Sequence, residues 1–206
     1  MVKDRLRCAR ACKEFNRYAE DVPRRRQVEL WRQIVKDDRP LPPQREGSTE
    51  EEDDVLFEDD PWVAPPFRAD NGNIRVGKGS FINCNCTIID TCLVTIGSRV
   101  MFGPSVHIYS GTHPIDPDLR NGIKGPELGA EVVIGDDCWI GGNATILPGV
   151  RIGRGSTVGA GSVVTKDVAE YSVVVGNPAK FLKPAPRNTI SEEERQKIYD
   201  IAMASS

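Results

Sequence analysis

An aliphatic side chain returns every six residues through the C-terminal half of the chain. The bulky positions are Ile134, Ile140, Ile146, Ile152, Val158 and Val164. Four residues after each of them stands a smaller side chain, in the order Cys138, Ala144, Val150, Ser156, Ser162 and Val168. A repeat with one bulky and one compact inward position is typical of a parallel β-helix whose sides are hexapeptides. The pattern therefore predicts a β-helix over this region.

The same ladder occurs upstream in two other registers. One runs through Val76, Ile82 and Ile88, and the next runs through Ile96, Phe102 and Ile108. The ladder then stops until Ile134, which leaves room for one hexapeptide and an excursion of roughly twenty residues. With three hexapeptides to a turn, the repeats predict a body of roughly four to five coils.

The segments that flank the repeats have a different composition. Two helices are expected over residues 3–19 and 23–36, and a short terminal helix is expected from Ser191, which forms a capping-box pattern with Glu194. The segment between the first helices and the repeats is rich in proline and acidic residues, which predicts a linker. We therefore divide the chain into a helical region at 1–36, a linker at 37–60, a β-helix domain at 61–183 with a loop at 110–131, and a tail at 184–206.

Composition and charge narrow the function classes. The chain has 27 Lys and Arg against 30 Asp and Glu, a formal net charge of −3, which disfavours a nucleic-acid partner. No apolar run reaches the roughly 20 residues of a membrane span, and the first residues lack the apolar centre of a signal peptide. We expect a cytoplasmic protein without a membrane partner. Three of the six cysteines occupy compact inward positions, so disulfides are not needed to explain them.

Several segments resemble the maltose and galactoside O-acetyltransferases in order and spacing. They are FINCNCTIID, SGTHPIDPDLR, GPELG, WIGG, GAGSVVTKD and VVVGNPAK. The resemblance extends from Pro65 to about Lys183, and ACKEFN and RRRQVELWRQIV are similar to the helical region of fungal members. It implies a left-handed parallel β-helix, acetyl-CoA as cosubstrate with no metal, and a homotrimer whose sites lie between subunits.

His113 is the candidate general base, and it lies in the excursion that interrupts the repeats. A sugar hydroxyl must lose its proton as it attacks a thioester, and histidine is suited to accept a proton near neutral pH. The resemblance implies that Glu127 orients the histidine or the hydroxyl. It also implies that Asn83 faces the reacting groups and binds the acceptor.

The resemblance also implies the binding residues. Those for the sugar acceptor are Asp70, Phe81, Asn83 and Arg26. Those for CoA are Trp139, Gly142, Ala160, Thr165, Lys166, Lys180 and Lys183. The chain departs from the family pattern at Arg17, Asn71 and Thr91, and these departures concern the identity of the sugar.

Other functions remain open from the sequence. The same scaffold can acetylate serine, an amino sugar or an antibiotic, and a β-helix can also serve as a scaffold that binds proteins without catalysis. A zinc carbonic anhydrase of this fold needs three histidine ligands, whereas the chain has two histidines. We expect an acetyl-CoA-dependent O-acetyltransferase that acts on a hydroxyl of maltose, glucose or a galactoside.

Overall fold

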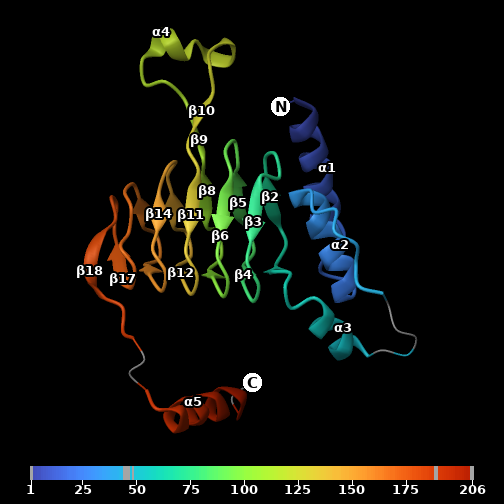
Figure 1. The fold of residues 1–206 in the computed structure, drawn as a ribbon. Coiled ribbons are helices and arrows are strands. Elements are labelled where there is room, and N and C mark those ends of the chain that lie inside the picture. The colour runs from blue at the N-terminus through green and yellow to red at the C-terminus, as the bar shows by residue number, and fades with distance from the viewer. Residues whose placement is uncertain (1, 44–46, 48, 188–189, 205–206) are drawn as a thin grey trace.

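The computed structural model describes residues 2–43, 47, 49–187 and 190–204. The chain forms the predicted left-handed parallel β-helix, preceded by helices and followed by an arm that ends in a helix (Figure 1). Each coil has three sides, A, B and C, and the strands of one side pair in parallel from coil to coil. Because each coil stacks directly on the one before it, residues at equivalent positions form columns along the molecule.

The three sides are built from short strands. Side A contains β1 (Trp62–Val63), β4 (Phe81–Ile82), β7 (Met101–Phe102), β12 (Trp139–Ile140), β15 (Thr157–Val158) and β17 (Ser172–Val175). Side B contains β2 (Phe67–Ala69), β5 (Cys86–Ile89), β8 (His107–Tyr109), β13 (Thr145–Ile146) and β16 (Val163–Val164). Side C contains β3 (Ile74–Val76), β6 (Val94–Ile96), β11 (Val132–Ile134) and β14 (Arg151–Ile152). We call the turns between sides A and B the AB edge, and those between B and C the BC edge.

The body has five coils, and β17 begins a sixth. The repeats alone predicted four to five, because the first coil starts in a proline-rich segment that does not follow the hexapeptide pattern. Trp62 of β1 nevertheless pairs with Phe81, and Phe67 of β2 pairs with Cys86. At the other end, β18 (Lys180–Pro184) folds back antiparallel on β17 and covers the last coil.

The predicted ladder forms the core. Ile88, Ile108 and Ile146 lie in register on side B, and none of them exposes any surface. Burial of an aliphatic side chain contributes about 1.5–3 kcal/mol, so the column is a main source of stability. The compact positions also carry hydrogen bonds, since Ser80 Oγ accepts from the Val100 amide at 3.0 Å and donates to the Gly97 carbonyl at 2.9 Å.

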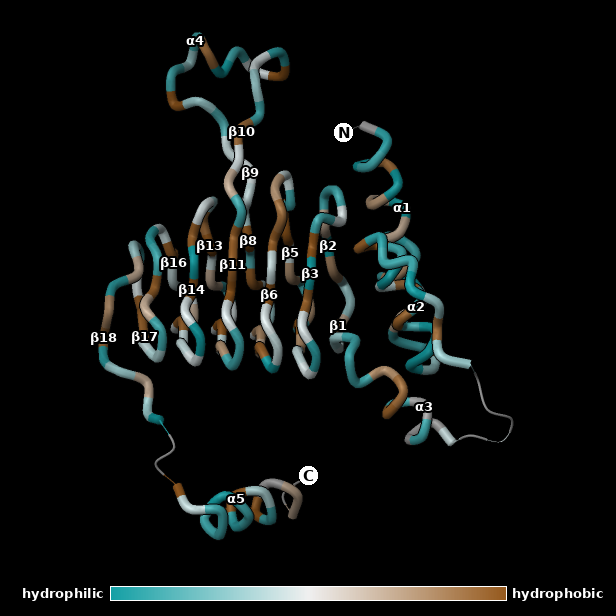
Figure 2. Tube along the Cα trace, viewed as in Figure 1, coloured by the Kyte–Doolittle hydropathy of each residue, from teal (hydrophilic) through white to brown (hydrophobic). Residues whose placement is uncertain are grey.

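The two helices expected near the N-terminus are present, and they cover the open end of the first coil. They are α1 (Val2–Tyr18) and α2 (Arg24–Val35), in which brown apolar positions alternate with teal hydrophilic ones (Figure 2). The apolar residues Phe15, Leu30 and Ile34 are buried. Trp31 of α2 meets Phe67 of β2 edge to face, with ring centroids 5.3 Å apart. Gly72 closes this contact, because a Cβ atom there would lie 2.0 Å from the Ile34 carbonyl oxygen. The helices are therefore part of the folded core.

A third helix, α3 (Glu50–Leu56), lies within the segment expected to be a linker. Thr49 and Glu52 form a capping box, a signal that was not recognised in this acidic segment. Asp60 is buried, and both its carboxylate oxygens accept hydrogen bonds from Arg32, at 3.0 and 2.7 Å. The end of this segment is thus fixed to α2.

The predicted excursion is an arm that leaves the BC edge of the third coil (Figure 1). Its base is an antiparallel pair, β9 (Gly111–Thr112) and β10 (Leu128–Gly129), and its tip holds α4 (Pro117–Arg120) and a 3-10 turn at Gly122–Lys124.

The terminal helix α5 (Glu192–Ala204) has the predicted Ser191–Glu194 capping box. In the described part of the chain, no helix combines the length and the apolar character needed to cross a membrane.

Candidate active site

His113 and Glu127 face each other at the base of the arm. His113 follows β9 directly and Glu127 precedes β10 directly, and the register pairs Thr112 with Leu128. The next positions outward in this antiparallel pair are His113 and Glu127, so the two side chains share one end of the hairpin. His113 is exposed and Glu127 is half-buried. The structure therefore brings together two of the three predicted catalytic residues.

Arg5 of α1 links this pair to Asp70. Its guanidinium lies 2.8 Å from Asp70 Oδ2 and 2.6 Å from Glu127 Oε2, and Thr91 Oγ1 donates to Glu127 Oε1 at 3.0 Å. Burial favours the protonated form of Glu127, but the hydrogen bonds from Arg5 and Thr91 outweigh burial. The pKa of the Glu127 carboxyl group consequently lies below its ordinary value, with a further contribution from the charge of His113. Glu127 is thus held as a carboxylate beside the histidine.

A buried carboxylate fixes the turn that carries Asp70. Asp90 exposes no surface, and its Oδ1 accepts hydrogen bonds from the amides of Asp70 at 2.7 Å and Asn71 at 2.9 Å. Its Oδ2 accepts from the amide of Asn73. Hydrogen bonds to an ionised group are about twice as strong as neutral ones. The position of Asp70 at the BC edge therefore depends on Asp90.

Asn83, Gly142 and Ala160 lie at the AB edge, in the second, fourth and fifth coils. Asn83 Oδ1 accepts from the Cys84 amide at 2.8 Å, which leaves the Asn83 amide group free to donate. The backbone N–H groups of Gly142 and Ala160 donate to no acceptor within the described ranges. This edge therefore offers several hydrogen-bond donors to an oxygen that becomes negatively charged.

Phe81 and Trp139 belong to a row of large side chains on the outer face of side A. Trp62 pairs with Phe81, Phe81 with Met101, and Met101 with Trp139. Trp139 is 58% exposed, although a tryptophan usually loses most of its surface in a folded protein. This apolar row is a surface against which a substrate or a second protein chain can pack.

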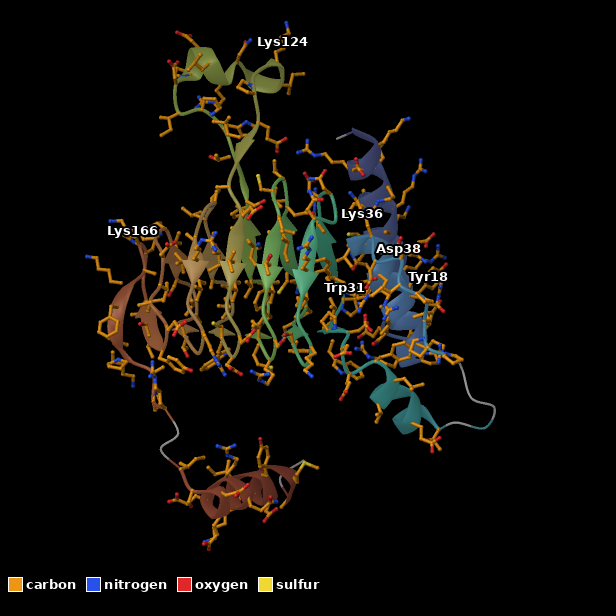
Figure 3. All side chains as sticks on the ribbon, viewed as in Figure 1. Tyr18, Trp31, Lys36, Asp38, Lys124 and Lys166 are labelled. Atoms are coloured by element: carbon orange, nitrogen blue, oxygen red, sulfur yellow. The ribbon has the colours of Figure 1, made fainter. Side chains whose placement is uncertain are left out.

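The remaining predicted CoA residues are spread over the far end of the molecule. Thr165 and Lys166 lie at the BC edge of the fifth coil, where Figure 3 shows Lys166 at the same upper edge as the arm. Lys180 and Lys183 lie on β18, and both are exposed. They do not meet Trp139 and Gly142 in one compact site within a single chain.

The candidate site consequently falls into two groups. His113, Glu127 and Asp70 lie at the BC edge, whereas Asn83 and Gly142 lie at the AB edge. The four residues of β5 separate these edges by roughly 13 Å, since a strand rises about 3.3 Å per residue. One chain alone therefore does not place His113 next to Asn83.

The structure brings Arg5, and not Arg26, to Asp70. Arg26 lies on the exposed surface of α2, where its guanidinium forms an ion pair with Glu29 at 2.7 Å. Arg5 had no signal in the sequence, because it is one of several arginines in a basic helix and its carboxylate partners lie far along the chain. Within one chain, the arginine beside Asp70 is Arg5, and the role of Arg26 in acceptor binding stays a prediction.

A family model described as a bacterial transferase hexapeptide of six repeats matches residues 131–166. The galactoside O-acetyltransferase of Lactococcus lactis is 43% identical over 119 residues, which are 57% of this chain and 56% of that protein. The match spans about three fifths of the length of such curated relatives from yeasts and bacteria.

Solved structures of acetyltransferases match nearly the whole chain. A maltose O-acetyltransferase from Clostridium difficile is 38% identical, with a TM-score of 0.75 over 90% of this chain and 88% of that one. A hexapeptide-repeat acetyltransferase from Vibrio cholerae, solved with acetyl-CoA, is 29% identical, with a TM-score of 0.71 over 90% and 89%. The fold of most of the chain is therefore shared with solved acetyltransferases. The chain belongs to the maltose and galactoside O-acetyltransferase family of hexapeptide-repeat acetyltransferases.

Proposed function

We propose that this protein transfers the acetyl group of acetyl-CoA to a hydroxyl of a sugar of the maltose, glucose or galactoside type. The observation that carries the proposal is the cluster at the BC edge, in which Glu127 and Asp70 share Arg5 and Glu127 faces His113. A base, two carboxylates and a guanidinium suit a neutral polyol, because sugar hydroxyls both donate and accept hydrogen bonds. The names of the relatives support the same class of acceptor.

In the proposed reaction, the oxygen of the sugar hydroxyl attacks the thioester carbonyl, and His113 accepts the proton of that hydroxyl. The carbonyl oxygen becomes negative in the tetrahedral intermediate, and the N–H of Gly142 and the amide of Asn83 donate to it. The carbon–sulfur bond then breaks, and the CoA thiolate takes the proton from the imidazolium. Glu127 is a positioning residue that stabilises the charged imidazole during this cycle.

Acetyl-CoA is proposed to lie along the AB edge. The free N–H groups of Gly142 and Ala160 point to hydrogen bonding with the pantetheine arm, and Trp139 offers an apolar wall beside it. The phosphates are proposed to reach beyond this edge, to Thr165 and Lys166 at the BC edge and to Lys180 and Lys183 on β18, since lysine acts as a point charge for such groups. The acetyl-CoA complex of the Vibrio cholerae relative supports this cosubstrate.

The separation of the two edges supports a site shared between chains. A base at the BC edge can act on a thioester at the AB edge only if the two edges belong to neighbouring molecules. Three chains around an axis would satisfy this requirement for every site at once, because a closed ring leaves no edge unused. We therefore propose a homotrimer in which His113 and Trp139 act from different chains.

The proposed cytoplasmic location is supported by the cysteines. All six are free thiols, which is usual for proteins of a reducing compartment.

Release of the free CoA thiol from acetyl-CoA tests the activity. The assay uses maltose, glucose, a galactoside, serine, glucosamine and chloramphenicol, with His113→Ala beside the wild type. We expect sugar-dependent release that falls by about 10²–10⁴-fold in the variant, the usual contribution of a general base. Release with serine, glucosamine or chloramphenicol alone would assign another acceptor. No release with any acceptor, from a folded protein, would indicate a non-catalytic scaffold.

A further inference from the structure

A groove of about 530 Å³ runs between α1 and β2 and begins beside the acceptor carboxylate. Arg5 and Asp70 line one end, and Lys13, Arg17 and Arg68 line the remainder. The floor is fixed, because Asn16 of α1 exchanges two hydrogen bonds with the backbone of Phe67, at 2.9 and 2.7 Å. The groove is thus a formed feature that continues from the site of the proposed reaction.

The cations of this groove lack carboxylate partners. Lys13, Arg17 and Arg68 are exposed, and none of them forms an ion pair with any residue the structure describes. Asp70 is the single acidic residue that lines the groove, and it is paired with Arg5 rather than with Lys13, Arg17 or Arg68. The three cations Lys13, Arg17 and Arg68 therefore give the groove an excess of positive charge next to the acceptor site.

Several other cations of the N-terminal helices are partnered, in contrast to those of the groove. On the opposite face of α1, Arg7 donates to the carbonyl oxygens of Ile34 and Asn71, and Lys36 lies 3.0 Å from Asp4. Arg32 is bound by Asp60. Three cations without an ion pair among the described residues thus lie together beside the acceptor site.

The spacing of the cations sets the length of a ligand. Arg5, Ala9, Lys13 and Arg17 follow at four-residue steps along one stripe of α1. At 1.5 Å per residue, Lys13 lies about 12 Å beyond Arg5 along the helix, and Arg17 lies about 18 Å beyond it. A ligand that spans from Arg5 to these cations is longer than one sugar ring.

We propose that this groove binds an anionic group of the acceptor, so that the preferred acceptor is an oligosaccharide of at least two rings that carries a phosphate at the end remote from the acetylated hydroxyl. The inference rests on the proposed function, since it places the reactive end of the acceptor at His113. Arginine binds a phosphate through two parallel hydrogen bonds and lysine binds it as a point charge. A neutral sugar would make no use of either.

The test compares maltose with maltose 6′-phosphate as acceptors in the thiol-release assay. The double variant Lys13→Gln/Arg17→Gln is compared with Arg10→Gln, an exposed cation of the same helix that does not line the groove. We expect kcat/KM to be at least about tenfold higher for the phosphorylated disaccharide in the wild type and in the control. The double variant loses this preference and keeps its kcat/KM for maltose. The preference also weakens in high salt, because exposed charges are screened.

Equal kcat/KM for the two sugars, or a preference that survives in the double variant, would overturn the inference. If no sugar is acetylated, the proposed function fails. Calorimetry of maltose 6′-phosphate binding then tests separately whether the groove binds an anion. Binding to the wild type that is lost in the double variant supports the groove as an anion site. Lack of binding to the wild type contradicts it.

Discussion

Arg5 and Glu127 stand 122 residues apart in the chain, and the Arg5 Nη2 and Glu127 Oε2 atoms lie 2.6 Å apart. The contact fastens the first helix to the base of the arm that carries His113. The same guanidinium reaches Asp70 at 2.8 Å, so one residue holds both sides of the proposed acceptor site. The N-terminal helices thus take part in the proposed catalysis as well as in capping the β-helix.

Replacing Arg5 with alanine is predicted to impair catalysis more than folding. Without the guanidinium, Glu127 and Asp70 repel each other and shift, and a displacement of about 1 Å in a positioned group can reduce the rate by about 10²-fold. We expect kcat/KM for the sugar to fall by about 10–100-fold. Because the Arg5 side chain is 38% exposed, its ion pairs contribute no more than about 1 kcal/mol to folding. Acceptor kinetics and urea unfolding measure both effects, with Arg10→Ala as the control. Unchanged kinetics would refute the role of Arg5.

The pKa of Glu127 predicts a pH dependence of stability. Because hydrogen bonds from Arg5 and Thr91 outweigh burial and lower the pKa of this group, its contribution to stability is complete above its ordinary pKa of about 4.3. The contribution disappears as the pH falls through the lower pKa of the folded state. The difference in unfolding free energy between the wild type and Glu127→Gln should therefore be larger at pH 6 than at pH 3. A difference that grows on acidification would contradict this assignment.

Asp90→Asn is predicted to affect stability and acceptor binding together. In the wild type, the buried Asp90 carboxylate accepts hydrogen bonds from backbone N–H groups. The substitution places a side-chain amide group, itself a donor, against these donors. We expect the free energy of unfolding to fall by about 2–4 kcal/mol, the range for loss of a buried charge-assisted network. The KM for the sugar should rise because Asp70 moves, whereas the KM for acetyl-CoA should not. Asp70→Asn is the control, since it should raise the sugar KM and leave stability nearly unchanged. Equal unfolding curves for Asp90→Asn and the wild type would be the contrary result.

The fold was largely predictable, because hexapeptide spacing sets which side chains point inward. Ile134, Ile140, Ile146, Ile152, Val158 and Val164 are all buried, as the ladder predicted. The hexapeptide pattern does not reveal the first coil, because Trp62 and Phe67 owe their positions to pairing with later strands. The helix α3 was missed because its acidic composition resembles that of a linker. Local composition does not reveal that Phe57 and Asp60, which follow this helix, become buried.

The site was predictable only where a motif carried it. His113 and Glu127 were named from two separate motifs, and the β9–β10 register places them opposite each other. Arg5 was missed because its role arises from tertiary packing of α1 on the first coil, which leaves no periodic signal in the sequence. Sites between subunits were expected from the resemblance alone, since a hexapeptide position by itself does not show which chain completes the site.

Gly142→Pro is predicted to slow the reaction by removing a donor. Pro104 occupies the equivalent position in the coil below, so the edge accommodates a proline ring. Loss of one oxyanion donor costs about 10²–10³-fold in kcat. Gly142→Ala keeps the N–H and adds the same Cβ, which would lie 3.1 Å from the Pro104 carbonyl oxygen, so it is the matched control. If the alanine and proline variants have the same kcat, the N–H of Gly142 plays no part in the reaction.

Mixed trimers of His113→Ala and Asn83→Ala chains test most directly whether the two edges act from different chains. Chains are mixed in equal amounts by joint refolding, and a second mixture combines wild type with the double variant. If each site draws Asn83 from one chain and His113 from its neighbour, both mixtures should recover about one quarter of the wild-type activity. Each of the two chains at a site carries the required intact residue in about half of the cases, and both must carry it. If each chain holds a complete site, the first mixture should stay inactive and the second should show about one half. That second pattern would contradict the shared site.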